Sequence, residues 1–565
     1  MNRDKLKPML FSNLKTYNGK KLVTDVVAGI IVAIIALPLS IALALASGVS
    51  PEQGIYTAII AGFLISFLGG SRVQIAGPTA AFATIVAGIV ATKGMGGLAI
   101  ATIMAGIILI IMGFLRLGSL IKFIPYTITT GFTAGIAVTI VIGQVKDFLG
   151  LTYTAGTKTI ETMEKMEAIG NHIHTINWQA VLVGVVCLAV LIVWPYITDK
   201  IPGSLIAVLV GIAMVKLLNM NVSTIGNLYN ISNELPKFQM PDFSFETIKE
   251  MLPDAFTIAI LAAIESLLSC VVADGMINSH HRSNMELIAQ GVGNIGSAFF
   301  GGIPATGAIA RTAANIKNGG RTPIAGITHS LVLVLVLVLL MPYAAMIPMP
   351  TIAAILFMVA YNMCQWRTFV HLCKTAPKSD ILVLVVTFFL TVLFDLVVAI
   401  EVGMLMAVVL FMKRMSDEST VSGWKYYDPD EDPDGPELKV LPKHVLVYEI
   451  SGPMFFGDAD RLASIKFKET TRVIIMRMRG VPALDATAMH AMDQLYSRCA
   501  EKGIRLVFSH VNEQPRHTME KAGFITKVGE DNFCPHIDDA LAWSEKLVAE
   551  AKKKAMAEAR EQAGK

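Results

Sequence analysis

Two interrupted apolar segments, VQIAGPTAAFATIV (residues 73–86) and IPATGAIARTAANI (residues 303–316), say most about the fold of this chain. Glycine and proline break each run, at Gly77-Pro78 in the first segment and at Pro304 and Gly307 in the second. A stretch of small residues follows each break and can begin a helix. Non-helical backbone at membrane depth survives only beside protein or water. The sequence therefore predicts a buried site at mid-membrane where two helix N-termini meet.

The composition supports a membrane protein. Of 565 residues, 54% are hydrophobic and only 16% are charged, which is too apolar for an ordinary soluble chain. The charge is sparse from about residue 25 to 412 and dense afterwards, so the net charge of +3 is an average over two different regions. It does not indicate a nucleic-acid partner. The six cysteines show no CxxC pair and no metal-ligand spacing. Neither a disulfide framework nor a metal site is expected.

The apolar runs predict fourteen membrane crossings. A bilayer core of about 30 Å takes roughly 20 residues as a helix. Two of the fourteen are the interrupted segments, 73–90 and 303–317. The full spans are expected near 26–45, 52–69, 97–116, 124–146, 178–198, 202–218, 252–274, 284–301, 322–341, 345–362, 379–396 and 398–412.

The basic residues predict the orientation of these spans. The N-terminal segment is rich in lysine and has no cleavage site, so the first span is expected to be retained. With a cytoplasmic N-terminus, most basic residues fall on the inside, as the positive-inside rule requires, and the C-terminus is also cytoplasmic. These residues are Arg72, Arg116, Lys122, Lys200, Arg282, Lys317, Arg321, Arg367, Lys374, Lys378, Lys413 and Arg414.

The second interrupted segment comes seven spans after the first. Broken spans at matching positions of two inverted halves are the sequence pointer to a transporter site. Each helix N-terminus offers free N–H groups and about half a positive charge, and Arg311 adds a full charge in the first turn. The expected substrate is therefore an anion. The alternative is that glycine and proline only kink these helices.

One carboxylate, Glu265, lies near the centre of the apolar run AFTIAILAAIESLLSCVVADGM (residues 255–276). An ionised carboxylate there costs at least about 2.5 kcal/mol, so a partner or a function is expected. Ser269 is one turn away on the same face. Glu265 could hold a proton, coordinate a cation, pair with Arg311 or simply tie two helices together. Our hypothesis is that it takes up the proton that accompanies the anion.

The C-terminal region reads as a small soluble domain. Residues 416–440 form a polar, proline-rich linker that is expected not to pack, and 441–550 alternate between apolar strands and helices. The tail, 551–565, reads as a charged helix. Strands are expected at HVLVYEI (444–450), RVIIMRM (472–478) and IRLVFSH (504–510), with helices around 458–468 and 486–502.

Several strings resemble one known family. ALPLSIALALASGVSPEQGIYTAI (residues 36–59) resembles the signature of the first two spans of the sulfate permease (SulP) family, which includes the prestin-like anion exchangers. SGPMFFGDAD (451–460) and VPALDATAMHAMDQL (481–495) resemble its cytoplasmic STAS domain, an α/β domain. The resemblance covers nearly the whole chain. It implies a polytopic α-helical membrane domain of two inverted seven-span repeats, as in the uracil permeases.

The resemblance also implies how the parts divide. After a cytoplasmic segment (1–22), the transporter domain (23–415) would have a core of spans one to four and eight to eleven. This core would move against a gate of spans five to seven and twelve to fourteen, in an elevator-like cycle. The STAS domain would occupy 441–550. In it Ala486, not serine, follows Asp485, so phosphorylation of a serine there cannot act as a switch.

The resemblance implies the residues of the anion site and no cofactor, metal or catalytic residue. Sodium-coupled bicarbonate members carry aspartate at the Glu265 position and lack the arginine, which puts sodium coupling in doubt. ESLLSCVVADGM and ATGAIARTAANI look closer to bacterial members that move C4-dicarboxylates with protons; sulfate also fits. The implied substrate residues are Leu39, Leu43, Thr79, Ala80, Glu265, Ser269, Gly307, Ala308 and Arg311.

The leading hypothesis is a proton-coupled anion symporter in the inner membrane, expected to form a homodimer and to bind an unidentified cytoplasmic partner through its STAS domain. An anion exchanger or channel for chloride or bicarbonate is the second, and a membrane-anchored STAS scaffold the third. An enzyme is disfavoured, because the sequence has no Walker A motif, nucleophile elbow or Rossmann fingerprint.

Overall fold

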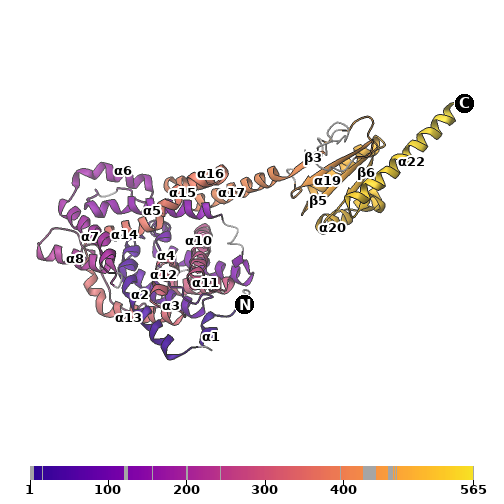
Figure 1. Ribbon diagram of the computed structural model, residues 1–565. Helices are drawn as coiled ribbons and strands as arrows, with labels where there is room; N and C mark the ends of the chain where they lie inside the picture. Colours follow the sequence, from indigo (N-terminus) through magenta and orange to yellow (C-terminus); the bar gives the residue numbers. More distant parts are fainter. Residues whose placement is uncertain are drawn as a thin grey trace. The chain divides into compact units, whose positions relative to one another are not determined.

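The computed structural model describes residues 6–14, 17–119, 125–154, 157–198, 201–241, 243–394, 396–423, 441–455, 462, 465 and 467–563. The chain divides into two compact units, Met1–Leu405 and Met406–Lys565. The first is helical and the second contains a five-stranded sheet (Figure 1). Lys122, Lys200, most of the predicted linker and most of the helix expected at 458–468 lie outside the described residues.

A helix lies on every predicted span. Eight of the described helices are long and apolar enough to cross a membrane. The set is consistent with fourteen crossings, and the count itself stays a prediction. The helices are α2 (Gly19–Ala46), α3 (Pro51–Leu68), α4 (Ala83–Phe114), α5 (Tyr126–Leu149), α7 (Trp178–Ile197), α8 (Gly203–Leu217), α10 (Phe245–Ile277), α11 (Ser283–Phe299), α12 (Ile309–Lys317), α13 (Ile324–Ala344), α14 (Met349–Cys364), α16 (Lys378–Leu393) and α17 (Leu396–Glu418).

Helix α4 holds two of the predicted spans in one element. It contains the helical half of the first broken segment and the span that follows, with Gly94 between them. Gly94 has a φ of 66°, a left-handed conformation that glycine adopts without a steric penalty. The helix therefore turns at this residue, as two separate spans require.

Each broken segment contains a short strand before its helix. β1 (Ala76–Gly77) pairs antiparallel with β2 (Thr306–Gly307). The 3₁₀ turn η2 (Ala80–Phe82) and α4 follow β1, and α12 follows β2. The prediction of a half-extended, half-helical segment at both positions is confirmed.

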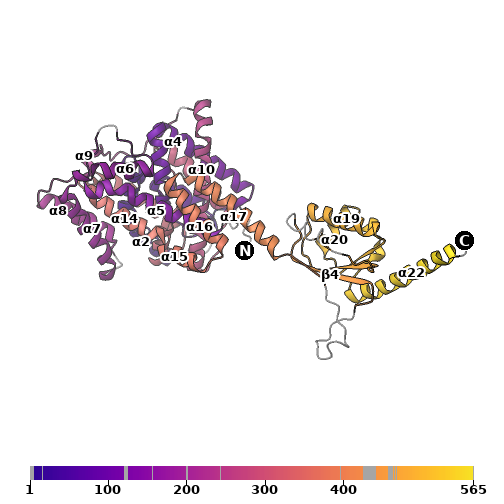
Figure 2. The ribbon, with the colours of Figure 1, turned by 90° about the horizontal axis from the view of Figure 1, so that it is seen from above.

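The helices of the first unit pack in two groups. Helices α2, α3, α4 and α10–α13 contact one another extensively, and α5, α7, α8, α14 and α16 form the second group. Figures 1 and 2 show α7 and α8 on the opposite side of the unit from α10. Helices α4 and α11 cross where Gly106 meets Gly291, since a Cβ on either would lie within 2.6 Å of the other's carbonyl oxygen. Small residues permit this close approach in membranes.

The second unit is an α/β domain. Its sheet has the order β3-β4-β5-β6-β7, and only the β3–β4 pair is antiparallel. The predicted strands are confirmed as β4 (Val445–Ser451), β5 (Val473–Gly480) and β6 (Arg505–Ser509), and β7 is Phe533–Cys534. Alternate strand residues face two cores. One core includes α19 (Ala486–Glu501), α20 (Glu513–Lys521) and α21 (Phe524–Val528), and the other includes α22 (Ile537–Ala563).

The beginning of the predicted linker is ordered. We expected residues from 416 onward to be too polar to pack, but α17 continues to Glu418 and Thr420–Gly423 form β3. Among the described strands, this one is at the edge of the sheet and pairs with β4 alone. Its Val421 packs against the core next to α19. Edge strands are short and tolerate polar residues, so composition alone did not reveal β3.

Candidate functional site

The two broken segments satisfy each other's backbone groups. Ala308 N donates to Ile75 O at 2.9 Å, and Ile75 N donates to the Thr312 hydroxyl at 3.1 Å. The Asn315 amide donates to Val73 O at 2.8 Å. Extended backbone inside a membrane needs such partners. The crossing of β1 and β2 is therefore a fixed frame that orients the helices beginning after it.

Arg311 is the charged residue of this frame. Its side chain is 1% exposed, and Nη2 donates to Pro78 O at 3.0 Å. A Cβ added to Gly77 would lie 2.4 Å from Nη1, so the guanidinium rests directly on the break in the first segment. Among the described residues, Nε and Nη1 have no hydrogen-bond partner. A buried guanidinium with two unused donor nitrogens is suited to binding an anion.

Glu265 contacts the first broken segment and not Arg311. The Thr79 hydroxyl donates to Glu265 Oε2 at 2.9 Å, and both side chains are half-buried. Among the described residues, no ion pair joins Glu265 to Arg311, which corrects one of our alternatives. The two charged groups have different partners: the Arg311 guanidinium donates to Pro78 O, and the Glu265 carboxylate accepts from the next residue, Thr79.

Ser269 contacts the helix that follows the second broken segment. It is 1% exposed and donates to the Thr312 hydroxyl at 3.4 Å. One turn earlier, Ser266 donates to the Thr306 hydroxyl at 3.0 Å and accepts from Gly307 N at 3.0 Å. Ser266 therefore ties α10 to the second strand. We missed this residue, although it directly follows Glu265 in the sequence.

The remaining predicted residues lie around the same frame. Ala308 is the N-cap of α12, and Ala80 begins η2 directly after its N-cap Thr79. Leu43 is buried and Leu39 is half-buried on α2, a helix that packs against α12. The structure thus brings together Thr79, Glu265, Gly307 and Arg311, with Ala80 and Ala308 at the two helix starts.

A buried carboxylate on α11, Glu286, was also missed. It is 0% exposed and accepts from Gly70 N at 2.8 Å, Ser71 N at 3.1 Å, Gln74 Nε2 at 2.8 Å and Gln290 Nε2 at 2.9 Å. Asn294, two turns beyond Glu286, exchanges two hydrogen bonds with the backbone of Ala305. This helix face therefore anchors the backbone leading into both strands.

The signal for this anchor is present in the sequence. Glu286, Gln290 and Asn294 are spaced by four residues, which places them on one face of a helix. Three polar side chains on one face of a membrane span require buried partners. The Gln74 side chain also packs against Gly307, where an added Cβ would lie 2.2 Å from Nε2.

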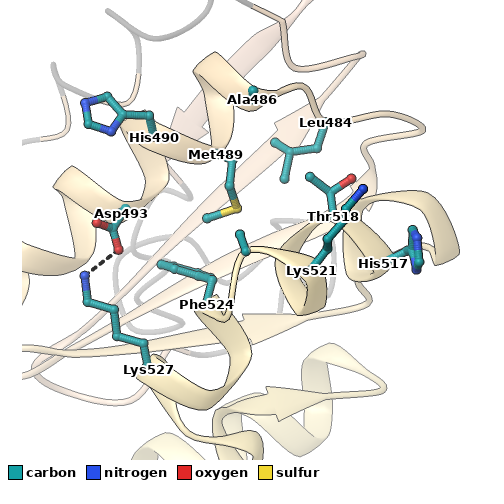
Figure 3. A pocket seen from close by; sticks show the side chains of 11 residues that line it. Leu484, Ala486, Met489, His490, Asp493, His517, Thr518, Lys521, Phe524 and Lys527 are labelled. Carbon is teal, nitrogen blue, oxygen red and sulfur yellow. Dashed lines mark hydrogen bonds and ion pairs between the residues drawn. The ribbon is translucent and has the colours of Figure 1, made fainter.

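The STAS-like unit has its own groove, between α19 and α20–α21 (Figure 3). Met489 and Phe524 form part of an apolar floor, and the rim carries Lys521 and the Lys527–Asp493 ion pair. At the start of α19, the Asp485 carboxylate accepts from Ala488 N at 2.8 Å. Asp485 therefore acts as a helix N-cap.

Comparison with known proteins agrees with this architecture. The sequence model described as the sulfate permease family matches residues 22–387, and the STAS domain model matches 436–540. The chain is 38% identical to the putative sulfate transporter YvdB of Bacillus subtilis, over 94% of this chain and 99% of that protein. It is 31% identical to the bicarbonate transporter BicA of a Picosynechococcus species, over 92% of this chain and 94% of that protein.

A solved structure shows the same fold. The murine Solute Carrier 26 family member A9 anion transporter superposes with a TM-score of 0.85 at 19% identity, covering 96% of this chain and 94% of that chain. The curated relatives are named as transporters, not as enzymes. On the family model and on these relatives, the chain belongs to the sulfate permease family, as a multi-pass membrane transporter with a C-terminal STAS domain.

Proposed function

We propose that this protein is a secondary active carrier that takes up a small oxyanion, sulfate or a C4-dicarboxylate, together with a proton. The observation that supports it most is Arg311, buried where two helix N-termini begin and left with two unpartnered nitrogens. Two helix N-termini and one guanidinium attract negative charge. The name of the Bacillus subtilis relative favours sulfate.

Bicarbonate is the second candidate substrate. It rests on the Picosynechococcus relative, which is named as a bicarbonate transporter. An exchanger or channel with the same site would move either anion without a proton. Substrate choice and coupling are therefore tested in the same experiment.

We propose an elevator-type cycle for the membrane unit. The β1–β2 pair joins the two broken segments, so they would move together as part of the group formed by α2–α4 and α10–α13. The group of α5, α7, α8, α14 and α16 would stay in place as the gate. By the positive-inside rule, both termini would be cytoplasmic at the inner membrane, and two copies would assemble as a homodimer.

Glu265 is the proposed proton carrier. Its carboxylate is held by Thr79 at the start of the first half-helix. A proton would neutralise it and lower the free energy required to move the loaded site through the bilayer. Proton release on the other side would restore the charge. Because Thr79 donates a hydrogen bond to Glu265 and is the N-cap of η2, protonation of Glu265 would alter the helix start that faces the anion.

Replacing Glu265 with glutamine is expected to remove proton-driven accumulation. The assay is uptake of labelled sulfate, fumarate and bicarbonate into proteoliposomes, with and without an inward proton gradient. The wild type should accumulate one anion severalfold more with the gradient, and Glu265→Gln should lose this difference. Glu250→Gln, an exposed carboxylate on the same helix, is the control that should behave as wild type. Gradient-driven uptake in Glu265→Gln would refute the proton role, and gradient-independent flux in the wild type would favour the exchanger or channel.

Replacing Gly77 with alanine is expected to reduce anion uptake at least about tenfold. The added Cβ would lie 2.4 Å from Arg311 Nη1, so the guanidinium must leave its position, and a tenfold loss corresponds to only about 1.4 kcal/mol. Gly88→Ala in α4 is the matched control, since a Cβ there meets nothing within 4 Å. Equal uptake by the two variants would show that the position of Arg311 does not matter.

A further inference from the structure

The short N-terminal helix α1 (Met9–Asn13) is fixed to the membrane unit on one side. Met9 is buried, and its backbone N donates to Gly69 O at 2.8 Å, in the loop after α3. At the start of α11, the Arg282 guanidinium donates to the Ser12 hydroxyl at 3.0 Å. These contacts hold α1 beside the ends of two membrane helices, so its other side also has a fixed position.

The other side of α1 is apolar and exposed. Phe11 is 43% exposed, and Leu14, directly after the helix, is 48% exposed. The Phe11 ring meets Phe67 edge-on with centroids 5.9 Å apart, and Phe67 stacks on Phe63, which is itself exposed. Phe63 and Phe67 lie on α3, a helix long and apolar enough to cross a membrane. The row of three rings therefore continues from the outer surface of a membrane span onto α1.

The charges around α1 are mostly positive. The first 27 residues contain two acidic side chains and six basic ones, Arg3, Lys5, Lys7, Lys15, Lys20 and Lys21. Lys7, Lys20 and Lys21 are exposed. The acidic Asp25 is buried and accepts hydrogen bonds from two backbone N–H groups just before α13. Exposed lysines at the end of a membrane helix attract the phosphate groups of anionic lipids.

We propose that α1 lies in the membrane surface and binds anionic phospholipid. Phe11 and Leu14 enter the region between the headgroups and the acyl chains, and the exposed lysines pair with lipid phosphate groups. Interfacial helices bind through this combination of apolar contact and charge attraction. The apolar side chains accept any phospholipid, so the preference for anionic lipid comes from the lysines. The inference is independent of the transported anion and of Glu265.

A second copy of the chain is the competing occupant of this surface. In a two-fold dimer the same patch faces itself, so the lysines of one copy would approach those of the other. Like charges across an interface oppose association. The charge of this segment therefore favours an anionic lipid surface over a second copy.

The test is fluorescence quenching of Phe11→Trp in the full chain, reconstituted in vesicles of phosphatidylcholine and phosphatidylglycerol. Bromine on the acyl chains quenches a nearby tryptophan, and the signal of position 11 is the difference between the variant and wild type in the same lipid. Brominated phosphatidylglycerol should quench at least about twofold more than brominated phosphatidylcholine at the same mole fraction. High salt should reduce this preference, because it screens the lysines.

Two lysine variants of Phe11→Trp identify the source of the preference. Replacing Lys7, Lys20 and Lys21 together with glutamine should make the two brominated lipids quench equally. The matched control removes three other exposed lysines that are expected on the same side of the membrane, and it should keep the preference. The control substitutions are Lys374→Gln, Lys378→Gln and Lys413→Gln.

Two results would overturn the proposal. Equal quenching of Phe11→Trp by the two brominated lipids at low salt would show that α1 does not select anionic lipid. Absence of quenching by either lipid would show that another surface, such as a second copy of the chain, covers Phe11. Should Phe11→Trp fail to fold, Leu14→Trp allows the same comparison, and should the lysine variant fail to fold, the salt dependence decides.

Discussion

Replacing Arg311 with alanine is expected to abolish anion binding and uptake. The two unpartnered nitrogens, Nε and Nη1, are the donors left for a substrate. A hydrogen bond to a charged group contributes about 1.5–3 kcal/mol, so losing two should weaken binding at least about 100-fold. The measurement is anion affinity by calorimetry, together with uptake into proteoliposomes.

Two further variants make this result interpretable. Arg311→Lys keeps the charge but loses the planar fork, so we expect binding that is weaker than wild type yet stronger than in Arg311→Ala. Lys317→Ala removes an exposed charge from the end of the same helix, α12, and should leave affinity unchanged. Wild-type affinity in Arg311→Ala would contradict the anion site proposed here.

Replacing Glu286 is expected to have the largest effect on stability. The carboxylate accepts four hydrogen bonds and is fully buried. Each buried donor left unpaired costs about 1–3 kcal/mol, so Glu286→Ala should yield little monodisperse protein. In Glu286→Gln, one oxygen acceptor becomes an NH₂ group facing donors, so only part of the network survives.

The measurement is the midpoint of thermal unfolding of purified protein, with size-exclusion chromatography as the check on folding. We expect Glu286→Gln to unfold at a measurably lower temperature than wild type, because part of the buried hydrogen-bond network is lost. Glu250→Gln removes an exposed carboxylate and should unfold as wild type does. A Glu286→Gln protein as stable as wild type would show that the four contacts add little.

The broken segments could be predicted from sequence because the signal is local. Gly77-Pro78 and Pro304 exclude a continuous helix whatever surrounds them, and a membrane leaves few alternatives for the freed backbone. The antiparallel pairing of β1 with β2 was not predicted, because the two strands lie more than 200 residues apart in the chain. Strands β4, β5 and β6 of the C-terminal unit were equally local, since each is a short apolar run in the sequence.

The partners of polar side chains could not be predicted in the same way. Glu286 binds Gly70, a residue far away in the chain, and no local pattern names such a contact. For Glu265 we weighed Arg311 as a partner from charge alone. In the structure the Glu265 carboxylate accepts a hydrogen bond from Thr79, whereas Arg311 donates to the backbone carbonyl of Pro78.

The pairing of β1 with β2 also bears on how the protein is made. Ala76 and Gly77 leave the ribosome long before Thr306 and Gly307, the residues that complete their backbone hydrogen bonds. Until the second half has entered the bilayer, the first broken segment has exposed peptide groups that lipid cannot satisfy. The nascent N-terminal half must therefore be sheltered by the insertion machinery or wait near the membrane surface. The first broken segment can therefore reach its final position in the membrane only after the second broken segment has been inserted.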